Sequence, residues 1–227
     1  MSKPEIHASA VVAPDARLGA NVKIGPFCTV GPDVDLGDGV ELVSHVAVAG
    51  RTTVGARTKI FPFASIGHEP QDLKFRGEPS TLTIGKECLI REGVTMNPGT
   101  EGGGMATSVG DNCAFLANSH VGHDCHVGNN VIFSNNVMLA GHCTVGDYVI
   151  IGGGAAGFAA ARELRTPYQG YSGPSAIVVV AQGQSAAGIL EQLHRAGEVG
   201  RNHDRCKRLD RRRCHHPQRD VRAGRDH

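Results

Sequence analysis

IGPFCTVGPDVDLGDGVELVSHVAVAG, residues 24–50, places an aliphatic side chain at every sixth position, and a glycine often follows it. The same spacing begins at Ile6 and continues unbroken to Ile66. Small or β-branched side chains take the fifth place of these six-residue units. A period of six is neither the helical 3.6 nor the 2 of a simple strand, and it is typical of a parallel β-helix.

The spacing stops after Gly67, resumes over residues 84–96 and runs again over residues 109–151. We therefore predict an all-β domain over residues 1–156, a parallel β-helix of hexapeptide repeats. Its resemblance to known families with this repeat implies a left-handed coil with three hexads per turn. Stacked coils would bury the inward side chains as continuous columns. The cysteines at inward fifth places are expected to be core residues of these columns: Cys28, Cys88, Cys113, Cys125 and Cys143.

Two loops are expected where the spacing breaks. Residues 68–82 read HEPQDLKFRGEPSTL, and residues 98–108 read PGTEGGGMATS. Long loops that leave a rigid coil are more often functional than not. The glycine run at residues 102–104 opens no predicted helix, which argues against a phosphate-binding loop.

The composition excludes several classes of partner. The formal net charge of +1 favours neither nucleic acid nor a membrane surface. No apolar stretch is long enough to span a membrane, and the N-terminus has no pattern of a secretory signal. The 7 cysteines include no C-x-x-C pair, so we expect neither disulfides nor a zinc knuckle, and a cytoplasmic location.

A histidine cluster is the best candidate for chemistry. His123 and Asp124 take outward places in one hexad, and His142 stands three hexads, or one coil, after Asp124. Stacking should bring these three side chains together on the surface. A metal site, an inert surface and a general base oriented by a carboxylate are the competing interpretations. The third is favoured, and we predict no metal, because His120 and His126 should lie on different faces of the coil.

Particular segments of the chain resemble a known family. The strings HDCHVGN, GHEPQDLKFRGEPSTLTIG and IREGVTMNPGT are similar to those of the UDP-N-acetylglucosamine O-acyltransferase family, over residues 6–156. The resemblance implies transfer of a 3-hydroxyacyl chain from acyl carrier protein to the 3-hydroxyl of UDP-N-acetylglucosamine, the first step of lipid A biosynthesis. A related class that acylates an amine has an extra N-terminal domain, and the repeat's start at Ile6 favours O-acylation.

The resemblance also implies roles for individual residues. His123 would be the general base, Asp124 would orient it, and the Gly141 N–H would stabilise the oxyanion. Substrate-binding positions would be Gln71, Asp72, Lys74, Asn97, His120 and His142, with Asn97 standing where some members have histidine. The family works as a homotrimer with active sites between subunits, and it needs no cofactor.

The family pattern ends near Ala156. Residues 148–165 read YVIIGGGAAGFAAARELR, and this G-x-G-x-x-G resembles the start of a dinucleotide-binding βαβ unit of flavin-dependent oxidoreductases. Gln182 stands where that unit would need an acid. We expect an atypical segment with helix and strand over residues 157–200 and a basic, disordered tail over residues 201–227.

Other hypotheses follow from this change of pattern. A splice, frameshift or chimera at the IIGGGAA string would explain why periodicity and family likeness end together. The chain could then be a non-catalytic or defective β-helix remnant, or carry a flavin-binding fragment over residues 148–182.

Overall fold

The computed structural model describes residues 2–152 and the strand Ile177–Val178. The chain divides into two compact units, Met1–Gln182 and Gly183–His227, and every described residue belongs to the first. The interpretations of residues 157–200 and 201–227 therefore lie outside the described residues, apart from that one strand. The predicted boundaries of the domains stay predictions.

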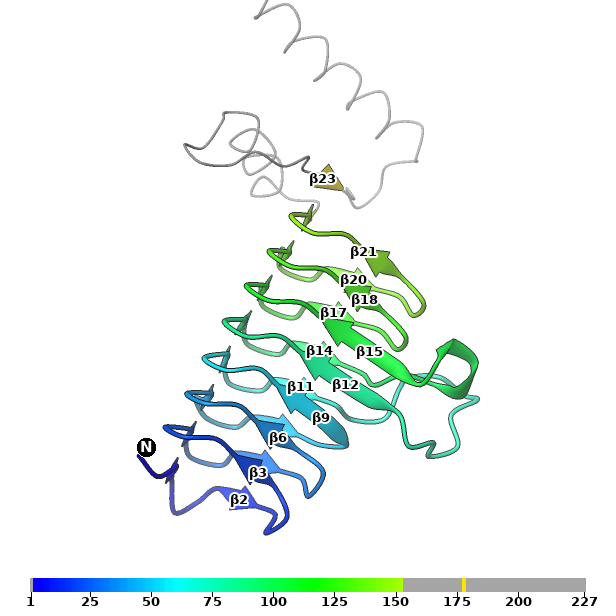
Figure 1. Ribbon diagram of the computed structural model, residues 1–227. Helices are drawn as coiled ribbons and strands as arrows, with labels where there is room; N and C mark the ends of the chain where they lie inside the picture. Colours follow the sequence, from blue (N-terminus) through cyan, green and yellow to red (C-terminus); the bar gives the residue numbers. More distant parts are fainter. Residues whose placement is uncertain (1, 153–176, 179–227) are drawn as a thin grey trace, which may run out of the picture. The chain divides into compact units, whose positions relative to one another are not determined.

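The described part is a left-handed parallel β-helix, as predicted, in which short strands stack into three parallel sheets (Figure 1). The first sheet contains β1 (Glu5–Ile6), β4 (Lys23–Ile24), β7 (Glu41–Leu42), β10 (Lys59–Ile60), β13 (Leu89–Ile90), β16 (Ala114–Phe115), β19 (Ile132–Phe133), β22 (Ile150–Ile151) and β23 (Ile177–Val178). The second sheet contains β2 (Val11–Val12), β5 (Thr29–Val30), β8 (Ala47–Val48), β11 (Ser65–Ile66), β14 (Thr95–Met96), β17 (His120–Val121) and β20 (Met138–Leu139). The third sheet contains β3 (Arg17–Leu18), β6 (Asp35–Leu36), β9 (Arg51–Val54), β12 (Thr81–Ile84), β15 (Ala106–Val109), β18 (His126–Val127) and β21 (Thr144–Val145).

The aliphatic side chains of the repeat form the core. In each strand pair the repeat residues face one another across the ladder, as Ile24 does with Leu42 and Val121 with Leu139. The bulkiest inward pair is Phe115 and Phe133, whose rings lie edge to face with centroids 4.9 Å apart. The inward cysteines are confirmed as core residues: Cys28, Cys88, Cys113 and Cys125 are buried, and Cys143 packs against the core.

Both loops are shorter than the sequence predicts. Thr81 and Leu82 already belong to β12, and residues 106–108 belong to β15, because parallel partners are available to pair with them. The second loop contains one short 3-10 helix, η1 (Glu101–Gly103), so the glycine run is not free of helical structure. The two loops leave the coil on the same side, next to β12 and β15 (Figure 1).

Candidate active site

Asp124 and His142 occupy the same corner of successive coils, just after β17 and β20. Both have a left-handed backbone, with φ of 56° and 61°. The His142 N–H donates to the His123 carbonyl at 2.9 Å, and the His123 and His142 rings meet at right angles with centroids 4.9 Å apart. The predicted stacking of Asp124, His123 and His142 is therefore confirmed.

Asp124 is not on the surface, and this corrects the sequence-based expectation. Its side chain is fully buried because the loop of residues 97–105 folds over it. The Thr100 N–H donates to Oδ1 at 2.8 Å, and the Thr100 hydroxyl donates to Oδ2 at 2.5 Å. The Asp124 N–H donates to the Thr107 hydroxyl at 2.8 Å. Thr100 and Thr107 lie in the non-periodic loop and at the start of β15, where the repeat offered no signal for them.

His123 and Asp124 form a hydrogen-bonded pair. Nδ1 of His123 lies 2.8 Å from Oδ2 of Asp124. An ionised carboxylate only accepts hydrogen bonds, so Nδ1 carries the proton and Nε2 has the free lone pair. The His123 side chain is 17% exposed, so the ring can be reached from outside although its partner carboxylate cannot.

The surroundings of Asp124 keep it ionised. Burial alone would raise the pKa of this carboxyl. The hydrogen bonds from the Thr100 hydroxyl, the His123 ring and the Thr100 N–H outweigh burial and hold the pKa below its usual value. The group therefore stays an acceptor that can hold an imidazolium on His123.

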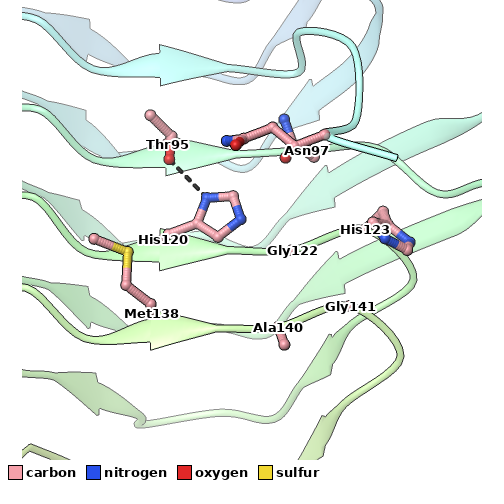
Figure 2. A pocket seen from close by; sticks show the side chains of 9 residues that line it. Thr95, Asn97, His120, Gly122, His123, Met138, Ala140 and Gly141 are labelled. Carbon is pink, nitrogen blue, oxygen red and sulfur yellow. Dashed lines mark hydrogen bonds between the residues drawn. The ribbon is translucent and has the colours of Figure 1, made fainter. Parts of the chain in front are cut away.

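A pocket of about 440 Å³ lies beside His123 on the outer face of the second sheet. In Figure 2, His120 and Met138 stand on one side of it and His123 and Gly141 on the other. The small residues between these two groups form its floor. The full lining is Gln71, Thr95, Asn97, His120, Gly122, His123, Met138, Ala140 and Gly141.

Gly141 is tightly placed next to the His123 ring. A Cβ at this position would lie 2.6 Å from Cε1 and Nε2 of His123, so any larger residue would have to displace the ring. None of the backbone hydrogen bonds of turns and loops in the described part of the chain uses the Gly141 N–H.

His120 faces the pocket from β17. Its Nδ1 lies 2.7 Å from the Thr95 hydroxyl, a contact that Figure 2 also shows. Burial, and then the nearby His123, lower the pKa of His120, so this ring is predominantly neutral at neutral pH. As predicted, His126 lies in a different sheet, on β18, where it contacts the Ser108 hydroxyl.

The first loop contributes less to the pocket than the family resemblance implies. Gln71 lines the pocket, whereas Asp72 and Lys74 do not. The Lys74 N–H donates to Asp72 Oδ1 at 2.9 Å, which makes a tight local turn. Asn97 is 5% exposed, and its amide donates to the carbonyls of His68 and Glu69 at 3.1 and 3.2 Å.

The same three residues, His123, Asp124 and His142, bear on metal binding. Ligand atoms of His123, Asp124 and His142 lie within 4.8 Å of one another, so this set could hold an ion, unlike the set that contains His120 and His126. Both oxygens of Asp124 already accept hydrogen bonds, from Thr100 and His123. These bonds favour the carboxylate as an orienting group, and the absence of a metal stays a prediction.

No helix within the described part of the chain combines the length and apolar character that a membrane crossing requires.

The chain is similar to known acyltransferases. The family model for the bacterial transferase hexapeptide (six repeats) matches residues 15–50 and 106–141. An acyl-[acyl-carrier-protein]–UDP-N-acetylglucosamine O-acyltransferase of Methylobacterium radiotolerans is 73% identical over 125 residues, which are 55% of this chain and 46% of the relative. The protein of the same name from Bartonella bacilliformis is 45% identical over 126 residues, 56% of this chain and 46% of that protein. The chain thus spans about half the length of these curated relatives.

Solved structures agree with this similarity. A crystal structure of a UDP-N-acetylglucosamine acyltransferase superposes with a TM-score of 0.65 at 49% identity, covering 66% of this chain and 57% of that one. The UDP-N-acetylglucosamine acyltransferase from Campylobacter jejuni gives a TM-score of 0.63 at 39% identity, covering 66% and 58%. These matches confirm the family resemblance of the N-terminal part of the chain.

Proposed function

We propose that the chain transfers a 3-hydroxyacyl group from acyl carrier protein to the 3-hydroxyl of UDP-N-acetylglucosamine, the first step of lipid A biosynthesis. The observation that carries this proposal is the His123–Asp124 pair, joined at 2.8 Å beside a pocket, in a chain similar to acyltransferases of that name. The acceptor hydroxyl needs a base near neutral pH, and an imidazole oriented by a carboxylate provides one.

The reaction starts with a proton transfer. Nε2 of His123 takes the proton of the sugar hydroxyl as the oxygen attacks the thioester carbonyl. The new C–O bond gives a tetrahedral oxyanion, and the unused Gly141 N–H donates to it. The intermediate collapses, the C–S bond breaks, and His123 returns the proton to the departing carrier thiolate. The products are the ester and the free thiol, and the charge on His123 is held throughout by Asp124.

The remaining pocket residues bind substrate in this proposal. His120 in its neutral form, Asn97 and Gln71 face the pocket and offer polar atoms to the sugar nucleotide. His142 stands next to His123 at the edge of the site. Asp72 and Lys74 lie in the same loop as Gln71 and would reach substrate at its outer side.

The same proposal includes the partners that the resemblance implies. The acyl donor is acyl carrier protein, and the chain acts as a homotrimer in the cytoplasm with its active sites between subunits. The second sheet, with the exposed Met138 beside His120, is the face that a neighbouring subunit would cover. No cofactor takes part in the chemistry.

Acyl transfer from acyl carrier protein to UDP-N-acetylglucosamine tests the proposal. His123→Gln keeps a polar side chain but removes the base, so kcat should fall about 100- to 10,000-fold. His126→Gln is the matched control, because His126 is exposed on a different sheet, and it should retain wild-type kcat. Equal activity of His123→Gln and wild type would reject His123 as the base.

Wild-type protein that folds but transfers no acyl group would reject the proposed function itself. That result would support the non-catalytic β-helix remnant instead. Bound flavin, seen as a yellow colour on purification, would support the dinucleotide-binding fragment.

A further inference from the structure

Thr100 stands at the N-cap of η1 but does not cap it. Threonine at this position ordinarily accepts a hydrogen bond from the first turn of its own helix. Here the backbone of Thr100 is extended, with φ −129° and ψ 163°, and its side chain makes no capping bond. The hydroxyl instead donates to Oδ2 of Asp124, 24 residues further along the chain. The Thr100 side chain therefore binds the buried carboxylate instead of capping its own helix.

We propose that Thr100 is a positioning residue that directs the Asp124 carboxylate to His123 rather than to His142. The expected changes in kcat rest on the proposed function. The hydrogen-bond geometry from which the inference is argued is independent of that function. The carboxylate has two histidine neighbours: Nδ1 of His123 is 2.8 Å from Oδ2, and Nδ1 of His142 is 3.9 Å from the same oxygen.

The terminal torsion of an aspartate is soft, so the carboxylate plane needs other groups to hold it. Thr100 donates a hydrogen bond to each oxygen of this carboxylate, from its N–H to Oδ1 and from its hydroxyl to Oδ2. These two bonds set the plane in which Oδ2 faces His123. Without the hydroxyl, the carboxylate plane can turn, and His142, whose side chain is 54% exposed and already 3.9 Å from Oδ2, can compete with His123 for the carboxylate.

Gly103 allows the loop to close over this arrangement. A Cβ at Gly103 would lie 1.9 Å from the carboxyl carbon of Asp124 and 2.3 Å from Oδ2, which no side chain could tolerate. The backbone of Gly103 does not have a positive φ, so the requirement is for space alone. The loop therefore combines one residue that binds the carboxylate with another that is small enough to seal it from water.

The test compares Thr100→Val, which removes the hydroxyl at nearly constant shape, with Thr100→Ser, which keeps it. The lost bond is charge-assisted, so kcat of Thr100→Val should fall about 10- to 100-fold while KM for UDP-N-acetylglucosamine stays within about twofold. Thr100→Ser should recover kcat to within about threefold of wild type. Thr58→Val is the matched control. Thr58 is also buried and hydrogen-bonded through its hydroxyl, but it lies directly before β10 of the first sheet.

Nitrogen NMR of the imidazoles gives a readout that a purely structural role would not change. Wild-type His123 should be the Nδ1–H tautomer, and Thr100→Val should give a tautomer mixture at His123 together with a shift at His142. This measurement does not need activity, so it separates failure of this inference from failure of the proposed function. Should the valine variant not fold, Thr100→Ala is measured in the same way. Unchanged kcat with an unchanged His123 tautomer, in a variant lacking the hydroxyl, overturns the inference.

Discussion

The Asn97 side chain hydrogen-bonds the first loop to the coil, and loss of its amide should weaken binding of the sugar nucleotide. Its amide donates to two successive carbonyls at the start of the loop, those of His68 and Glu69. Apart from these bonds, the side-chain hydrogen bonds of residues 68–80 in the structure are with one another or with Ser65. The loop bears Gln71, so its position decides whether that residue faces the pocket.

The size of the effect follows from the two bonds. A typical hydrogen bond contributes about 0.5–1.5 kcal/mol net, so Asn97→Ala should destabilise the closed loop by about 1–3 kcal/mol. Since about 1.4 kcal/mol is a factor of ten in an equilibrium, KM for UDP-N-acetylglucosamine should rise by about 5- to 150-fold. Asn97→Asp should be worse, because it keeps the shape but points a carboxylate oxygen at the same two carbonyls.

Steady-state kinetics and hydrogen exchange measure the two parts of this prediction. We expect KM to rise with kcat changed less than threefold, because Asn97 donates to the loop and not to the reacting atoms. Amide exchange should accelerate over residues 68–80 and remain slow in the sheets. The reasoning is refuted if Asn97→Asp retains both the wild-type KM and the wild-type exchange rates of this loop.

Three further predictions concern the His123 ring, the core and the pH dependence of stability. Gly141→Ala should lower kcat about 100-fold with little change in Tm, because the added methyl would lie 2.6 Å from the His123 ring and displace it; a retained kcat would show that the ring position is not critical. Phe115→Ala should cost about 3–5 kcal/mol of unfolding free energy in denaturant titrations, since its side chain is 0% exposed, whereas Leu73→Ala at 96% exposure should stay within about 0.5 kcal/mol. Burial lowers the pKa of His120 in the folded chain, so below about pH 6.5 the unfolded chain binds more protons than the folded chain. The contribution of neutral His120 to the free energy of unfolding is therefore complete above that pH. It is lost as the pH falls through the lower folded pKa. His120→Gln should therefore lose less unfolding free energy than wild type between pH 7.5 and 5, and equal losses would contradict the assignment.

The repeat made the fold and part of the site predictable. Stacking at a fixed register follows from the hexads, so the contact between Asp124 and His142 could be inferred by counting positions. The same counting correctly separated His120 from His126. Both the contact and the separation depend only on the geometry of the coil, which the six-residue period specifies.

The loops could not be predicted in this way, because no period relates their residues to the coils. Nothing in PGTEGGGMATS indicates that Thr100 would bind Asp124 or that Gly103 would pack against it. The burial of Asp124 was missed for the same reason. The ends of both loops were placed wrongly because residues next to β12 and β15 pair as strands even where the aliphatic spacing is interrupted.

The corners of the coil explain why the site lies where it does. A left-handed backbone recurs at corners throughout the β-helix, and asparagine meets this requirement at Asn112, Asn118, Asn130 and Asn136. Asparagine, aspartate and histidine adopt this backbone more readily than other side chains. Asp124 and His142 in place of asparagine, at the same corner of successive coils, therefore introduce an acid and an imidazole without changing the backbone that the fold demands. The left-handed conformation alone does not mark the functional corner, since the asparagine corners have the same conformation. The functional corner differs in its ionisable pair and in a loop that buries Asp124 and leaves His142 exposed.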